Sequence, residues 1–165
     1  MSSFNRRYLI AAIGAAGLAG CGFKPLYGEG QGGGAVGRFA LAEATNPVEY
    51  AYRERLRRRI GHSDGADLLV LSRVDLQERG VAVTRARDIT RFRVEGSATA
   101  QIVERGSGKV VATELVKGST GFDATSSVFA TRQARKAAEE RLAIDLAERA
   151  ATRILARAAE LGGGS

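Results

Sequence analysis

The feature that most constrains the fold is a long stretch near the C-terminus, residues 129–161, that contains neither glycine nor proline. It is rich in Ala, Arg, Glu and Leu, which are good helix formers. Its apolar residues recur at helical spacing and cover one side: Ala143, Leu146, Ala147, Ala150, Ala151, Ile154, Leu155 and Ala158. Because a helix with one apolar side must bury that side, the pattern predicts a long amphipathic helix lying on another layer of structure.

A sheet is the predicted second layer. The clearest alternation covers residues 90–102, with Phe92, Val94, Ala98, Ala100 and Ile102 on one face and Arg91, Arg93, Glu95, Ser97, Thr99 and Gln101 on the other. This pattern predicts a strand with one buried and one wet face. The run Leu68–Leu71, continued by Val74 and Leu76, predicts the preceding strand. Residues 105–108 predict a hairpin turn, and residues 110–116 the returning strand.

A short strand at residues 38–44 and a helix are predicted ahead of these strands. Asn46-Pro47 is typical of a helix start, and Val48, Tyr52, Leu56 and Ile60 recur at every fourth residue. Ser126 or Ser127 is expected to cap the C-terminal helix. We therefore expect a two-layer α+β domain, a four-stranded, mostly antiparallel sheet with two helices packed on one face. Its other face is expected to be polar and basic.

The first 21 residues resemble a lipoprotein export signal. Arg6 and Arg7 precede an apolar run, residues 8–18, which is too short to span a bilayer and ends in Leu18-Ala19-Gly20-Cys21. This tetrapeptide predicts cleavage between Gly20 and Cys21, with S-diacylglycerol and an N-acyl group such as palmitate on Cys21. Stable anchoring needs more than one acyl chain, which such a cysteine provides. The alternative is an N-terminal transmembrane anchor with a buried cysteine.

The predicted organisation is a signal peptide at 1–20, a lipidated Gly-rich tether at 21–37, a single domain at 38–161 and a disordered tail at 162–165. Gly22 stands where an inner-membrane retention signal would carry Asp, which favours the outer membrane.

Catalysis, metal binding and cofactor binding are not expected. The chain has one His and one Cys, and the Cys is assigned to lipid. His62-Ser63-Asp64 has the residue types of a hydrolase triad, but triads are assembled from separated segments. The Gly-rich stretch 28–37 lacks the Lys-Ser/Thr of a phosphate-binding loop.

The formal net charge of +7 suits a phosphate-bearing partner such as anionic lipid or lipopolysaccharide, although an Arg-rich composition can also come from a GC-rich genome. The scarcity of aromatic residues disfavours nucleic acid. Candidate lipopolysaccharide contacts are Arg91 and Arg93, with Arg85 and Arg87 just before them; a second basic cluster lies at residues 53–59. A solvated surface is the alternative for both clusters.

Residues Cys21-Gly22-Phe23-Lys24-Pro25-Leu26-Tyr27-Gly28 resemble the start of the mature chain in the LPS-assembly lipoprotein family, LptE, and residues 127–131 are similar to its alphaproteobacterial members. The resemblance implies two helices on a four-stranded sheet and an outer-membrane location on the periplasmic side. It also implies a role as plug and assembly partner of the β-barrel LptD in lipopolysaccharide transport. The long Gly-rich tether departs from the family pattern. The alternative function is another periplasm-facing lipoprotein, such as a transporter-accessory or ligand-binding subunit.

Overall fold

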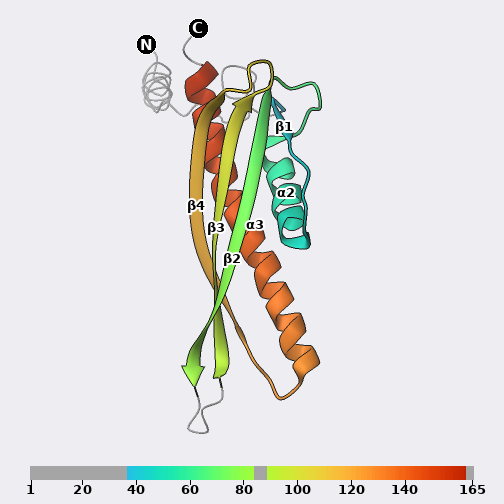
Figure 1. Ribbon diagram of the computed structural model, residues 1–165, viewed down its shortest axis with the longest axis vertical. Helices are drawn as coiled ribbons and strands as arrows, with labels where there is room; N and C mark the ends of the chain where they lie inside the picture. Colours follow the sequence, from blue (N-terminus) through green and yellow to red (C-terminus); the bar gives the residue numbers. More distant parts are fainter. Residues whose placement is uncertain (1–36, 84–88, 163–165) are drawn as a thin grey trace, which may run out of the picture. The chain divides into compact units, whose positions relative to one another are not determined.

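The computed structural model describes residues 37–83 and 89–162, which form a four-stranded sheet and two helices (Figure 1). The strands are β1 (Phe39–Leu41), β2 (Leu68–Val83), β3 (Ile89–Glu104) and β4 (Val110–Asp123). The helices are α2 (Pro47–Ile60), between β1 and β2, and α3 (Val128–Gly162) at the C-terminal end. This is the expected α+β fold, with the elements in the expected order.

The strands lie side by side in the order β1-β2-β3-β4. The pairs β2–β3 and β3–β4 are antiparallel, whereas β1 runs parallel to β2 because α2 returns the chain to the same end of the sheet. Two strands are longer than the side-chain pattern predicts. β2 continues through the polar residues 77–79 and β4 continues to Asp123, because backbone pairing with β3 does not require apolar side chains.

α2 begins as predicted. The Asn46 side chain accepts a hydrogen bond from the Glu49 N–H (3.0 Å), and Pro47 occupies the first turn. Tyr52, Leu56 and Ile60 are buried, and Val48 is half-buried against the same core. The helix ends at Gly61, whose φ of 76° is readily adopted only by glycine.

α3 begins after Ser127, whose hydroxyl accepts the Ala130 N–H (3.3 Å). The eight apolar residues that predicted its buried side are all buried, together with Ala138 and Leu142. Leu142 and Leu146 of α3 pack against the sheet where Gly96 of β3 pairs with Gly118 of β4. A Cβ at Gly96 would lie 2.5 Å from Leu76 Cδ2 and 3.0 Å from Leu142 Cδ2. The paired glycines therefore leave the room that the Leu142 side chain fills.

The outer edge of β1 is closed by the turn that follows α2. Gly37 N–H bonds to the Ile60 carbonyl (2.9 Å) and Ser63 N–H to the Phe39 carbonyl (2.9 Å). Leu41 N–H donates to His62 Nδ1 (3.2 Å). All three β1 residues are buried, so this short strand belongs to the core.

Candidate functional site

The two faces of the sheet are assigned by the alternation along β3. Val94, Ala98 and Ile102 are buried on the side of the helices, so Arg91, Arg93 and the other odd-numbered residues of β3 point to the opposite side. We call that side the helix-free face, because both helices lie on the other side (Figure 1). The β2 and β4 residues paired with these positions share the face.

The helix-free face is not uniformly polar and basic, and this corrects the sequence expectation. At the end nearest the β3–β4 turn it carries five apolar residues: Leu69, Leu71, Val103, Val110 and Leu115. Leu71, Val110 and Leu115 are exposed. Leu69 and Leu71 come from the start of β2, where four consecutive apolar residues place large side chains on both faces of the sheet. Val103 of β3 and Val110 and Leu115 of β4 reach the same face through their pairing with β2 and β3.

The charged end of the face holds the candidate lipopolysaccharide contacts. Arg91 bonds to Asp123 on β4 (Nε to Oδ1, 2.9 Å), directly opposite in the register. Arg93 is exposed and makes no ion pair with any residue that the structure describes. A weaker pair joins Glu95 to Arg79, which is opposite Arg93 in the register (3.9 Å). Arg73 pairs with Asp75 (3.4 Å) farther along the face, in the row of Leu115.

A hollow of about 400 Å³ lies at this end of the sheet. Arg91, Arg93, Ser119, Gly121 and Asp123 are among the residues that line it. Gly121 is opposite Arg93 in the register and has no side chain to occupy the space beside it. The arrangement offers one guanidinium held by a carboxylate and one without an ion-pair partner, which suits an anionic oxygen group.

The second basic cluster, residues 53–59 of α2, is largely used within the fold. Glu148 of α3 pairs with both Arg55 and Arg59, the latter at 2.8 Å. Arg53 donates to the Ala42 carbonyl (2.9 Å). Glu148 is not among the apolar residues that predicted the buried side of α3, and nothing in the helical spacing identified it as the bridge between the two helices.

The sequence pattern also did not predict that Glu114, on the helix side of β4, is largely buried and forms ion pairs with α3. The Glu114 side chain is only 11% exposed and accepts Arg157 (3.1 Å), with Arg153 at 3.8 Å. These pairs join α3 to the sheet. The hydrogen bonds and ion pairs to Glu114 and Glu160 raise the pKa of Arg157.

His62 and Asp64 do meet, but not as parts of a catalytic triad. His62 Nε2 lies 3.0 Å from Asp64 Oδ1, while Nδ1 accepts the Leu41 N–H. Both ring nitrogens therefore have partners, and Ser63 contributes its backbone N–H to β1. The cluster fixes the edge of β1.

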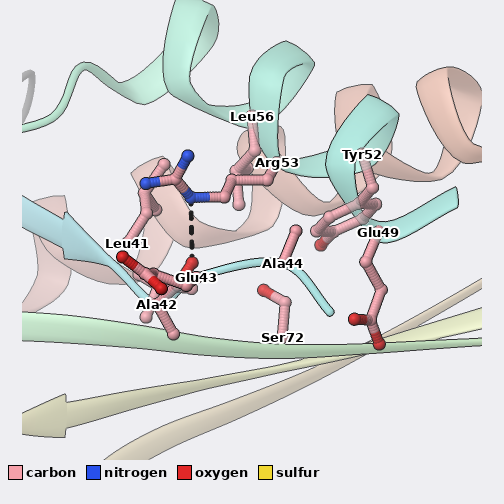
Figure 2. Close-up of a pocket in the computed structure, with 10 residues that line it drawn as sticks. Leu41, Ala42, Glu43, Ala44, Glu49, Tyr52, Arg53, Leu56 and Ser72 are labelled. Atoms are coloured by element: carbon pink, nitrogen blue, oxygen red, sulfur yellow. Dashed lines mark hydrogen bonds between the residues drawn. The ribbon is translucent and has the colours of Figure 1, made fainter. Parts of the chain in front are cut away.

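The pocket beneath the segment that leads from β1 to α2 is small. It has a volume of about 20 Å³, enough for about one water molecule. Figure 2 shows Tyr52 and Ser72 on opposite sides of it, with Arg53 reaching the backbone of Ala42. Burial raises the pKa of Tyr52 to about 12, and the Ser72 side chain opposes this rise with a smaller effect. The pocket belongs to the packing of α2 on the sheet.

Among residues 37–83 and 89–162, no group of three or more His, Cys, Asp or Glu side chains is placed to hold a metal ion. In the same part of the chain, no helix is both long and apolar enough to cross a membrane. Gly20, Cys21, Arg85 and Arg87 lie outside the described residues, as do the proposed tether up to residue 36 and the tail from residue 163.

A protein-family model described as LptE, lipopolysaccharide-assembly, matches residues 36–158. No curated protein matches the chain in sequence.

Several solved structures share the fold. A lipoprotein from Caulobacter crescentus CB15 has a TM-score of 0.65 at 22% identity, over 79% of this chain and 98% of that one. A minor lipoprotein from Acinetobacter baumannii has a TM-score of 0.55 at 15% identity, over 72% and 89% of the two chains. The rare lipoprotein B from Shewanella oneidensis has a TM-score of 0.51 at 12% identity, over 75% and 93%. At these identities the likeness extends to the fold alone.

Proposed function

Because the chain belongs to the LptE family of lipopolysaccharide-assembly proteins, we propose that it is the lipoprotein partner of an LptD-type outer-membrane β-barrel. In this role it acts as a plug and assembly factor for the barrel and takes part in moving lipopolysaccharide to the cell surface. The observation that carries the proposal is the family match, which runs from just before β1 to within a few residues of the end of α3. The proposal assigns no catalytic step to the chain.

The shape of the sheet supports a role in binding rather than chemistry. One face is covered by helices and the other is open over the length of three long strands. An open face with both apolar and charged sections can contact the polar interior of a barrel and an amphiphile at the same time. The apolar end of the helix-free face is available for packing, and the charged end for phosphate groups.

Lipid on Cys21 is the proposed anchor. The thiol takes the S-diacylglycerol and the amine exposed by cleavage after Gly20 takes the N-acyl chain. Gly22 favours delivery to the outer membrane, with the domain on its periplasmic side. We also propose that Arg91 and Arg93, joined by Arg85 and Arg87, contact lipopolysaccharide phosphates.

The test is co-purification of the tagged, full-length lipoprotein with the β-barrel from detergent-solubilised outer membranes. We expect the barrel to elute with the lipoprotein in a stable complex. The matched control carries residues 1–37 of this chain fused to an unrelated soluble domain, which preserves export and lipid but removes the proposed plug. Elution of the barrel with the control, or its absence from the full-length sample, would contradict the proposal.

A further inference from the structure

α2 and α3 lie beside each other on the same face of the sheet (Figure 1). A groove of about 900 Å³ is lined by side chains of both helices. Its walls are formed by residues between 46 and 58, which are the cap and most of α2, and by residues between 136 and 144 of α3. Glu148 of α3 joins the two helices through Arg55 and Arg59 and so bounds the groove. We call this space the helix groove.

Apolar side chains that the fold does not cover line the helix groove. Val48 and Ala51 are half-buried in its α2 wall. Tyr50, also on α2, is 59% exposed, and Ile144 on α3 is 36% exposed. A tyrosine ring and an isoleucine on the two walls of one concave surface are typical of a contact site.

The charges around the groove are not balanced within the described chain. Glu54 pairs with Arg53 and Arg57, and Glu139 pairs with Arg135. Arg58 on the α2 wall and Lys136 on the α3 wall make no ion pair with any described residue, and neither does Glu140. Each wall therefore presents one free cation, against a single free carboxylate.

Any polypeptide segment that binds in the helix groove must satisfy its backbone hydrogen bonds within itself. The walls are the sides of two helices, whose interior N–H and C=O groups are already bonded within each helix. An extended segment would leave its backbone polar groups without partners on these walls, which is costly away from water. A helix satisfies its own backbone and can lay an apolar ridge along the groove.

We propose that the helix groove is a docking site for an amphipathic helical segment of a partner protein. The apolar ridge of that segment packs between Tyr50 and Ile144, and acidic residues beside the ridge pair with Arg58 and Lys136. Residues 47–58 of α2 span about 17 Å at 1.5 Å per residue, so about three turns of the partner helix fit. The inference goes beyond the proposed function, since it concerns the helix side of the sheet rather than the helix-free face.

The chain contains no tryptophan, so a tryptophan on a peptide reports binding without background. Two synthetic amphipathic helices of equal length carry the same leucine ridge and one tryptophan; one has glutamates and the other lysines beside the ridge. Each is titrated into the detergent-solubilised full-length lipoprotein. We expect the glutamate peptide to bind at least about tenfold more tightly than the lysine peptide, a difference of about 1.4 kcal/mol.

Arg58→Glu should remove most of that preference. The matched control is Lys109→Glu, which makes the same change in charge at an exposed turn away from the groove. Equal binding of the two peptides, or no binding of either, would overturn the inference. So would an equal loss of binding in the two variants, because the effect would then come from overall charge.

In cells, a photo-crosslinking residue in place of Tyr50 should form an adduct with a protein, and Arg58→Glu should weaken that adduct at least severalfold. The cross-linked stretch should be helical and carry acidic residues. An adduct with lipid alone, or with an extended strand, would overturn the inference. Co-purification of the barrel tests the proposed function separately from the peptide titration. If the barrel does not co-purify with the unmodified lipoprotein, the proposed function is contradicted, whereas the inference about the helix groove is not.

Discussion

Several single polar residues fix the ends of elements in this fold. The Asn46-Pro47 start of α2 was predictable, because its partner Glu49 lies three residues along the chain. The bond from Leu41 N–H to His62 Nδ1 was not, because it joins residues 21 apart that meet only after α2 has formed. Local sequence therefore predicts caps that are made within one turn, and misses those made across an element.

Glu49 makes the stability of α2 depend on pH. Its carboxylate accepts the Thr45 hydroxyl (2.6 Å) and the Thr45 N–H (3.0 Å), and these bonds hold its pKa below the ordinary value of 4.5. A depressed pKa means that the carboxylate stabilises the fold above pH 4.5 and that this contribution is lost as the pH falls through the folded-state pKa. Glu49→Gln should therefore lower the free energy of unfolding at pH 7, by about 1 kcal/mol or less for so exposed a group.

Urea unfolding of both proteins across the acid range is the measurement. The difference between them should shrink toward zero below the folded-state pKa of Glu49. Glu43→Gln serves as the control, since Glu43 is exposed and makes no hydrogen bond or ion pair with a described residue. A difference for Glu49→Gln that stays constant with pH would show that packing, rather than the carboxylate charge, is lost.

Cys21→Ala tests the proposed lipid attachment. Only the thiol supplies the acyl linkage, so we expect an uncleaved precursor without lipid. Metabolic labelling with palmitate and the electrophoretic mobility of the product are the measurements. A normally cleaved, acylated protein from this variant would contradict the lipoprotein proposal.

At the scale of elements, the periodicity of apolar residues predicted which face of an element is buried, but not which other element that face contacts. The alternation along β3 and the helical spacing in α3 identified the buried faces of both elements. The length of β2 was underestimated, because residues 77–79 are polar and are held by backbone pairing to β3. The bridge from Glu148 to Arg55 and Arg59 was also missed, because helical spacing gives the face of a residue but not the neighbouring helix.

The face assignment of α3 leads to a paired prediction. Ile154 is fully buried, so Ile154→Asp places an unpaired charge in the core and should destabilise the fold by roughly 3 to 5 kcal/mol. Arg149 is exposed and pairs with Asp145 one turn away, so Arg149→Ala should change the stability by no more than about 0.5 kcal/mol. Thermal unfolding of the two variants is the measurement, and equal melting temperatures would refute the assignment.

Leu76 of β2 and Leu142 of α3 pack against Gly96 and make this position sensitive to added volume. A Cβ there would lie 2.5 Å from Leu76 Cδ2, so the leucine must move. Gly96→Ala should destabilise the fold by about 1 to 3 kcal/mol through overpacking. Gly65→Ala is the control, because no heavy atom lies within 4 Å of its added Cβ. If urea unfolding shows the same stability for both variants, the packing of Leu76 and Leu142 around Gly96 is looser than the structure describes.

At the scale of the whole molecule, the helix-free face divides into an apolar and a charged end. The sequence predicted the charged end from the alternation of Arg91 and Arg93 with apolar residues. It did not predict that Asp123 pairs with Arg91, because β4 was expected to end near Val116. The sequence thus placed both arginines on the exposed face of β3, and their contact with lipopolysaccharide stays a prediction. The difference between the two arginines follows only from strand pairing.

That difference gives the last prediction. Arg91 must release or share Asp123 to meet a lipid A phosphate, whereas Arg93 has no described ion pair to lose. Replacing both by Glu should weaken binding to purified lipopolysaccharide by at least about tenfold at low salt, through lost charge-assisted pairing and added repulsion. Arg93→Glu alone should account for more of the loss than Arg91→Glu alone. Lys109→Glu makes the same change in charge as each single variant, away from the site.

The salt dependence of binding distinguishes the loss of a phosphate contact from unfolding of the variant. Charges on an exposed face are screened beyond about 10 Å at 0.1 M salt, so the gap between the unmodified protein and the double variant should narrow as salt rises. The fold should survive, because Phe92 and Val94 on the other side of β3 keep their packing, including the stack of Phe92 on Phe122 with ring centroids 5.1 Å apart. Unchanged binding in the double variant would show that the phosphate contacts lie elsewhere than at this end of the sheet. Equal effects of the two single variants would show that Asp123 does not hold Arg91 back from the ligand.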